Sequence, residues 1–82
     1  MKTYENDITV IKTLSKLSSS RNGRYEKLVN LISTKGDCKA LDIRTYDKRN
    51  NKRAQGVTIY DGELDKFLDA VNQYMDEREK EN

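Results

Sequence analysis

The sequence contains no histidine, no proline and a single cysteine among its 82 residues. Cys38 therefore has no intrachain disulfide partner, and a zinc site of the Cys/His type is excluded. Residues 18–20 are three serines, but no histidine is available to activate one as a nucleophile, so a polar connection explains them better. No stretch is long and apolar enough for a signal peptide or a membrane span. We expect a reduced, intracellular protein of the cytoplasm or nucleoid, or of the host cytoplasm if a phage encodes it.

The chain is also poor in apolar residues, which make up 34% of the sequence against 37% charged residues. A domain of this length buries only about 60% of the surface that its unfolded chain exposes. Disorder is nevertheless disfavoured, because the apolar residues follow regular patterns. A core this thin predicts one domain, residues 1–82, that is completed by a second copy of itself.

The net charge of +2 conceals a strong asymmetry along the chain. Residues 12–53 carry a net charge of +8, whereas residues 54–82 carry −5. A basic body followed by an acidic end favours an anionic partner for the body. Chance segregation of charge on a small domain is the alternative.

The apolar pattern predicts four strands, at residues 8–17, 24–34, 38–46 and 56–60. In the first, we expect Val10 and Leu14 on one face and Ile11 on the other. Asn22-Gly23 and Lys35-Gly36-Asp37 are turn sequences between strands. The third strand alternates clearly, with Leu41 and Ile43 on one face and Arg44 and Tyr46 on the other.

The period changes at Asp61, a good helix N-cap. From there the apolar residues recur at helical spacing, which predicts one amphipathic helix. Its apolar face contains Leu64, Phe67, Leu68, Val71, Tyr74 and Met75. The acidic residues of this segment are explained by capping and solvation rather than by a metal site, and the polar tail, about residues 76–82, is expected to fray.

One helix covers only one face of a four-stranded sheet, so the face with Arg44 and Tyr46 is expected to be open. Lys48, Arg49, Lys52 and Arg53 lie in the loop that follows, and exposed ion pairs would gain them little. Facing a polyphosphate, the same charges would release counterions. An exposed Tyr46 ring could stack on an unpaired base, which favours a single strand over a duplex. The alternatives are an unliganded surface tyrosine and an Arg44 paired with Asp42.

Two segments resemble the C-terminal domain family of the transcriptional coactivator positive cofactor 4. They are "ALDIRTY" with its basic loop, and "GVTI" leading into the helix "GELDKFLDAVNQY". Lys35-Gly36 is similar to a turn of that family. The resemblance covers residues 35–75 and is thin over residues 1–34. Gln55 departs from it, since relatives usually carry lysine there, and the strand-two aromatic has no clear match beyond Arg24 or Tyr25.

The resemblance implies a curved antiparallel sheet of four strands followed by a helix, in a homodimer whose helices pack at the interface. It also implies single-stranded DNA held by basic and aromatic residues with little sequence preference. Arg44 matches the family's strand arginine, Tyr46 the aromatic two residues later, and Lys35 the turn lysine.

We therefore predict an α+β protein that binds single-stranded DNA in transcription regulation, replication or repair, with neither catalytic residues nor a cofactor or metal. The alternatives are an RNA-binding domain and a protein-interaction module, such as a phage-encoded inhibitor of a host factor. The predicted DNA-binding residues are Arg21, Arg24, Lys27, Lys35, Arg44, Tyr46, Lys48, Arg49, Lys52 and Arg53. The predicted dimer interface is the apolar face of the helix.

Overall fold

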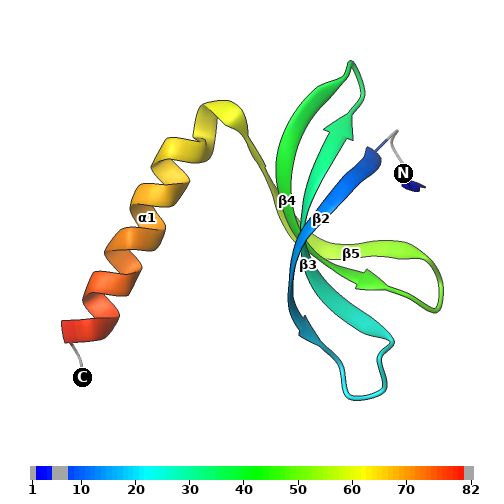
Figure 1. Cartoon of the computed structure of the whole chain (residues 1–82), viewed down its shortest axis with the longest axis horizontal. Coiled ribbons are helices and arrows are strands. Elements are labelled where there is room, and N and C mark those ends of the chain that lie inside the picture. The colour runs from blue at the N-terminus through cyan, green and yellow to red at the C-terminus, as the bar shows by residue number, and fades with distance from the viewer. Residues whose placement is uncertain (1, 5–7, 81–82) are drawn as a thin grey trace.

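The computed structural model describes residues 2–4 and 8–80, which form one antiparallel sheet followed by one helix (Figure 1). The elements are β1 (Lys2–Tyr4), β2 (Ile8–Ser19), β3 (Tyr25–Thr34), β4 (Cys38–Asp47), β5 (Lys52–Tyr60) and α1 (Asp61–Lys80). The strands lie in the sheet in chain order. The predicted four antiparallel strands and C-terminal helix are confirmed by β2–β5 and α1. The short edge strand β1 was not predicted, because a segment of three residues is too short to show a strand pattern.

The predicted turns are confirmed by the backbone conformation. Gly23 and Gly36 adopt the left-handed region, with φ of 75° and 86°. A side chain is strained at such angles, whereas glycine adopts them readily. Because successive strands are antiparallel, the β2–β3 and β4–β5 turns lie at one end of the sheet and the β3–β4 turn at the other (Figure 1).

Strand β2 does not follow the simple alternation that we predicted for it. Its pairing with β3 shifts three times, between Val10 and Lys12, between Thr13 and Ser15, and between Lys16 and Ser18. Each shift places two residues of β2 opposite one residue of β3, as in a β-bulge. The assignment of Val10 and Leu14 to one face is therefore wrong: Val10 packs on the core, whereas Leu14 is half exposed.

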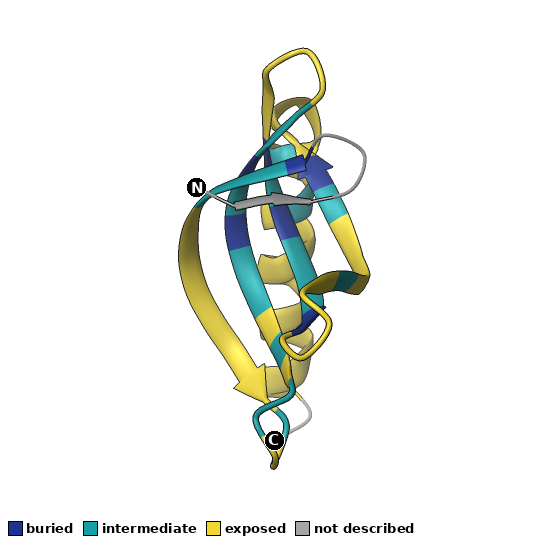
Figure 2. Ribbon diagram, turned by 90° about the vertical axis from the view of Figure 1, so that its right-hand side faces the viewer, coloured by how far each residue is buried: buried dark blue, intermediate teal, exposed yellow. Residues whose placement is uncertain are grey.

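The sheet is strongly curved, and the core lies on one of its faces (Figures 1 and 2). Ile8, Ile32 and Ala40 form a buried cluster, with Val10 packed against it. Strand alternation places this cluster on the same face as Asp42 and Tyr46 of β4. We call this the inner face; the outer face carries Leu41 and Ile43.

Helix α1 begins at Asp61, as predicted, and extends to Lys80. Residues 76–80 are thus helical rather than frayed, and residues 81–82 lie outside the described part of the chain. Glu63 accepts a hydrogen bond from the Tyr60 backbone N–H at 3.0 Å, which closes the first turn. The helix projects away from the sheet, and its main contacts with the sheet are with β5 and β4 (Figure 1). Within residues 2–4 and 8–80, no helix has the length and apolar character needed to cross a membrane.

Candidate nucleic-acid surface

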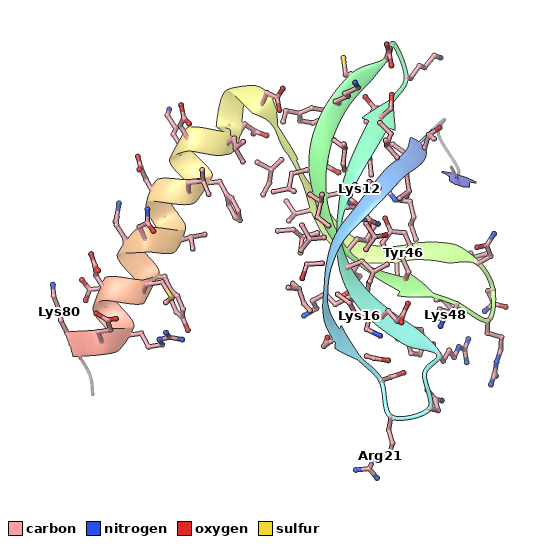
Figure 3. The ribbon with its side chains drawn as sticks, in the orientation of Figure 1. Lys12, Lys16, Arg21, Tyr46, Lys48 and Lys80 are labelled. Atoms are coloured by element: carbon pink, nitrogen blue, oxygen red, sulfur yellow. The ribbon has the colours of Figure 1, made fainter. Side chains whose placement is uncertain are left out.

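A hollow of about 280 Å³ opens on the inner face of the sheet. Its lining includes the apolar residues Val10 and Leu28, the aromatic Tyr46, and two lysines, Lys48 and Lys52. Figure 3 shows Tyr46 and Lys48 on the side of the sheet that faces away from α1. The lining residues are Val10, Thr13, Glu26, Leu28, Asn30, Tyr46, Asp47, Lys48, Asn51 and Lys52.

The fully buried carboxylate of Asp42 organises the inner face. Arg44 donates to it through Nε at 3.1 Å, and Arg53 through Nη2 at 3.2 Å. The hydroxyls of Thr58 and Tyr46 donate to it at 2.8 and 3.2 Å. Burial raises the pKa of Asp42, but the bonds from Arg44, Thr58 and Arg53 outweigh it and lower the pKa below its usual value. We call these five residues the Asp42 cluster.

Tyr46 is therefore not the exposed platform that we predicted. It is only 5% exposed, and its hydroxyl is committed to Asp42. The helix does not cover the inner face, but the sheet itself curls around it and buries Tyr46. Burial accordingly raises the pKa of Tyr46. A base cannot stack on this ring in the observed conformation, and the stacking role assigned to Tyr46 is wrong.

Arg44 and Arg53 are also held within the fold rather than offered to solvent. Each guanidinium forms an ion pair with Asp42, so the alternative of an Arg44–Asp42 pair is confirmed. Arg44 further donates through Nη1 to the Ala54 carbonyl at 3.0 Å. Two arginines share one carboxylate, which leaves the cluster with a surplus positive charge, but neither side chain is positioned as a free phosphate ligand.

Five of the predicted cations lie in or next to the β2–β3 and β4–β5 turns, at one end of the sheet. The Lys48 backbone N–H donates to the Arg24 carbonyl at 2.8 Å, which joins the two turns directly. The guanidinium of Arg24 donates to both carboxylate oxygens of Asp47, at 3.2 and 3.1 Å. We call this group of cations the basic rim; it consists of Arg21, Arg24, Lys48, Arg49 and Lys52.

Tyr25 is the exposed aromatic ring beside the basic rim. It is 39% exposed, and the guanidinium carbon of Arg24 lies 5.0 Å from the centre of its ring. This geometry is a cation–π contact. Tyr25 follows the rim residue Arg24 directly, so the ring stays beside the cations while its own surface remains accessible.

Two predicted residues lie away from the rim. Lys35 is in the β3–β4 turn, at the opposite end of the sheet. Lys27 alternates with Glu26 and Leu28, which line the inner hollow, and so it lies on the outer face. It borders a separate shallow depression there with Ile43 and Gln55. The structure therefore separates Lys35 from the rim, whereas Lys27 shares the outer face with Tyr25.

Lys16 is a rim neighbour that the sequence reasoning missed. Its ammonium group lies 3.5 Å from a carboxylate oxygen of Glu26, and that of Lys48 lies 3.8 Å from the same oxygen. The register shifts of β2 place Lys16 opposite Leu28 on the inner face. The signal was present in the sequence, since Ile11, Leu14 and Leu17 recur every third residue, a spacing that simple alternation does not produce.

The predicted interface residues of α1 share an exposed apolar stripe. Every residue of α1 is at least partly exposed, and much of the helix is coloured as exposed in Figure 2. Leu64 and Phe67 are half buried near the sheet, and Leu68, Val71, Tyr74 and Met75 are exposed. On the sheet, Val57, Leu14 and Leu17 are more than half exposed as well. The single chain thus leaves two apolar surfaces without cover from its own described residues.

A scan against protein-family models and a search of curated proteins both find no match to this chain.

Proposed function

We propose that the protein is a homodimer that binds single-stranded DNA with little sequence preference, in transcription regulation, replication or repair. The basic rim carries this proposal: two separate hairpins bring five cations to one end of the sheet, beside an exposed tyrosine. Cations that contact the phosphates of a nucleic acid gain affinity through counterion release. The resemblance to the positive cofactor 4 family points the same way.

The mechanism differs from the one expected from sequence. Tyr46 is buried, so we assign stacking on a base to Tyr25, whose ring is exposed beside Arg24. Base faces are accessible in a single strand and hidden in a duplex, and stacking on an aromatic side chain contributes about 1–3 kcal/mol per base. Phosphate capture by the rim and stacking on Tyr25 together favour single strands.

The homodimer is supported by the exposed apolar stripe of α1. The radius of gyration of the chain is 14.5 Å, whereas a compact domain of this length has a value of about 12 Å. The projecting helix accounts for the difference, and a second copy that packs against the stripe and the outer face would bury both. The same stripe favours the second candidate function, a protein-interaction module, if its partner is another protein.

The test is a fluorescence-anisotropy titration with labelled single-stranded and duplex oligonucleotides of equal sequence at several salt concentrations. The wild type should prefer the single strand, and log K should fall with log[salt] by about 0.7 per phosphate contacted. An RNA oligonucleotide in the same assay addresses the RNA alternative.

Two triple variants with the same change of charge locate the site. Replacing Arg21, Lys48 and Arg49 by Gln removes three rim cations, and should weaken binding about tenfold or more and reduce the salt slope by about 2. Replacing Lys66, Arg78 and Lys80 by Gln removes three helix cations and should change little. Equal losses in the two variants would contradict the proposed surface.

A further inference from the structure

Asp47 is an acidic residue in the middle of the basic rim, and it is almost completely buried there. It lies at the end of β4 and is 9% exposed. A carboxylate so close to the proposed DNA path would normally oppose binding, because it repels phosphate. Its position therefore calls for a structural reason, and its hydrogen bonds provide one.

Five hydrogen bonds converge on the two carboxylate oxygens of Asp47. Two come from the Arg24 guanidinium, at 3.2 and 3.1 Å. Three come from the β4–β5 loop: from the backbone N–H of Arg49 at 3.1 Å, the backbone N–H of Asn50 at 3.3 Å, and the Asn50 side-chain amide at 2.9 Å. The carboxylate thus joins the start of β3 to the loop that carries Lys48 and Arg49.

These bonds also set the plane of the Arg24 guanidinium. Its Nε and Nη2 face Asp47, while its central carbon remains 5.0 Å from the centre of the Tyr25 ring. One carboxylate therefore fixes three parts of the surface relative to one another: the loop backbone, the Arg24 cation and, through Arg24, the exposed ring. The same bonds, led by those of Arg24, hold the pKa of Asp47 far below its usual value, so it is ionised at neutral pH.

We infer that Asp47 is the positioning residue of the nucleic-acid surface: by tying Arg24 to the loop of Lys48 and Arg49, it holds the cations of two hairpins in one phosphate-binding arrangement. This inference rests on the proposed function. It assigns a favourable role to a negative charge that simple electrostatics would count against binding.

Glu26 provides the matched comparison, because it is a second acid at the same end of the sheet. It forms ion pairs with Lys16 and Lys48, at 3.5 and 3.8 Å, through exposed lysine side chains. Unlike Asp47, Glu26 accepts no hydrogen bond from the backbone of the β4–β5 loop among the residues that the structure describes. Removing either acid raises the net charge by one unit, but only the loss of Asp47 removes bonds to the loop of Arg49 and Asn50.

The experiment compares Asp47→Asn and Glu26→Gln in anisotropy titrations with a labelled oligothymidylate, at a temperature where circular dichroism shows both variants folded. Glu26→Gln should bind about twofold more tightly than wild type, with an undiminished salt slope. Asp47→Asn should bind about fivefold more weakly, and its slope should fall by about 0.7–1.4, the loss of one or two phosphate contacts. A smaller folded fraction would lower the affinity without changing that slope.

A third variant, Asn50→Ala, tests the same hydrogen bonds without changing the net charge. Asn50→Ala deletes one bond to Asp47 from an exposed loop residue and should weaken binding about twofold at constant net charge. The inference is wrong if Asp47→Asn binds at least as tightly as wild type, or if it binds more weakly with an unchanged salt slope. The proposed function would stand in both cases. A wild-type protein that does not bind the oligonucleotide overturns the proposed function itself, and the inference with it.

Discussion

The hydroxyl of Tyr46 donates a hydrogen bond of 3.2 Å to the buried carboxylate of Asp42, four residues earlier on the same strand. The two side chains lie on the inner face of β4, where strand alternation brings them together. Tyr46, which was predicted from the sequence to stack on a base, is therefore part of the interior. A substitution at Tyr46 should therefore change the stability of the fold and leave single-strand binding unchanged.

Tyr46→Phe keeps the ring and removes the hydroxyl that donates to Asp42. The unfolding free energy in urea should fall by about 1–2 kcal/mol, since the lost bond is to a charged group. Single-strand affinity should stay within about twofold of wild type, because the ring is buried in either case. Tyr25→Phe, a change at an exposed hydroxyl, is the control and should alter stability by less than about 0.5 kcal/mol. Reduced affinity at unchanged stability would instead restore Tyr46 to the binding surface.

Gly56→Ala tests the close approach of β5 to β4. A Cβ at position 56 would meet the Ile43 carbonyl oxygen and come within 2.6 Å of the Arg44 Cα, both of them backbone atoms that cannot move alone. We expect a loss of about 2–3 kcal/mol in thermal or urea unfolding.

Gly62→Ala is the matched control for that substitution. A Cβ at position 62 has no atom within 4 Å, and the residue lies in the first turn of α1. Alanine is the better helix former, so this variant should be about 0.5–1 kcal/mol more stable than wild type. Equal effects of the two substitutions would contradict the strand geometry.

Acid should destabilise the protein through Asp42 and Asp47. Both carboxyls have pKa values that are lower in the folded protein than their usual value, because arginines donate to them. Their contribution is present above the unfolded pKa of about 3.9 and is lost as pH falls toward the folded values. The unfolding free energy should thus be level near neutrality and decline below about pH 4. Asp47→Asn should flatten this decline; an identical pH curve would show that the Arg24–Asp47 pair adds nothing to stability.

The apolar stripe of α1 should hold the proposed dimer together. Val71→Asp places a carboxylate in the stripe, and Gln73→Asp places one on the opposite side of the same helix. In sedimentation equilibrium, wild type and Gln73→Asp should have the mass of two chains, and Val71→Asp that of one. A wild type with the mass of a single chain would remove the homodimer and leave the stripe to another partner.

Sequence patterns predicted the elements of this fold well, because each has its own period. The alternation from Ala40 to Tyr46 and the helical spacing from Leu64 to Met75 are both local properties. What alternation could not give is the curvature of the sheet. It assigns Tyr46 to a face, but whether that face is open depends on how far the neighbouring strands curl around it.

The candidate site was predicted in part, for a similar reason. Charge density drew attention to Lys48 and Arg49, and the structure joins their loop to Arg24 through the Lys48 backbone N–H. Arg44 and Arg53 carry the same formal charge but are paired with the buried Asp42; the sequence offered the Arg44 pair as an alternative, whereas the Arg53 pair depends on the packing of β5 against β4. The bonds of Asp47 to Arg49 and Asn50 are local, but its pairing with Arg24, on which the inferred role depends, spans 23 residues and had no local signal.

The three register shifts of β2 have a consequence for the pairing of this sheet edge with other chains. Beyond Val10, the edge of β2 that faces away from β3 has no neighbouring strand among residues 2–4 and 8–80. A flat, unpaired edge of that length is a site where strands of other chains can pair. The bulges interrupt its row of amide and carbonyl groups at every third position. Deleting Leu14 would keep Thr13 and Ser15 on their present faces while straightening that edge, so a shortened strand could fold normally and yet assemble into fibrils.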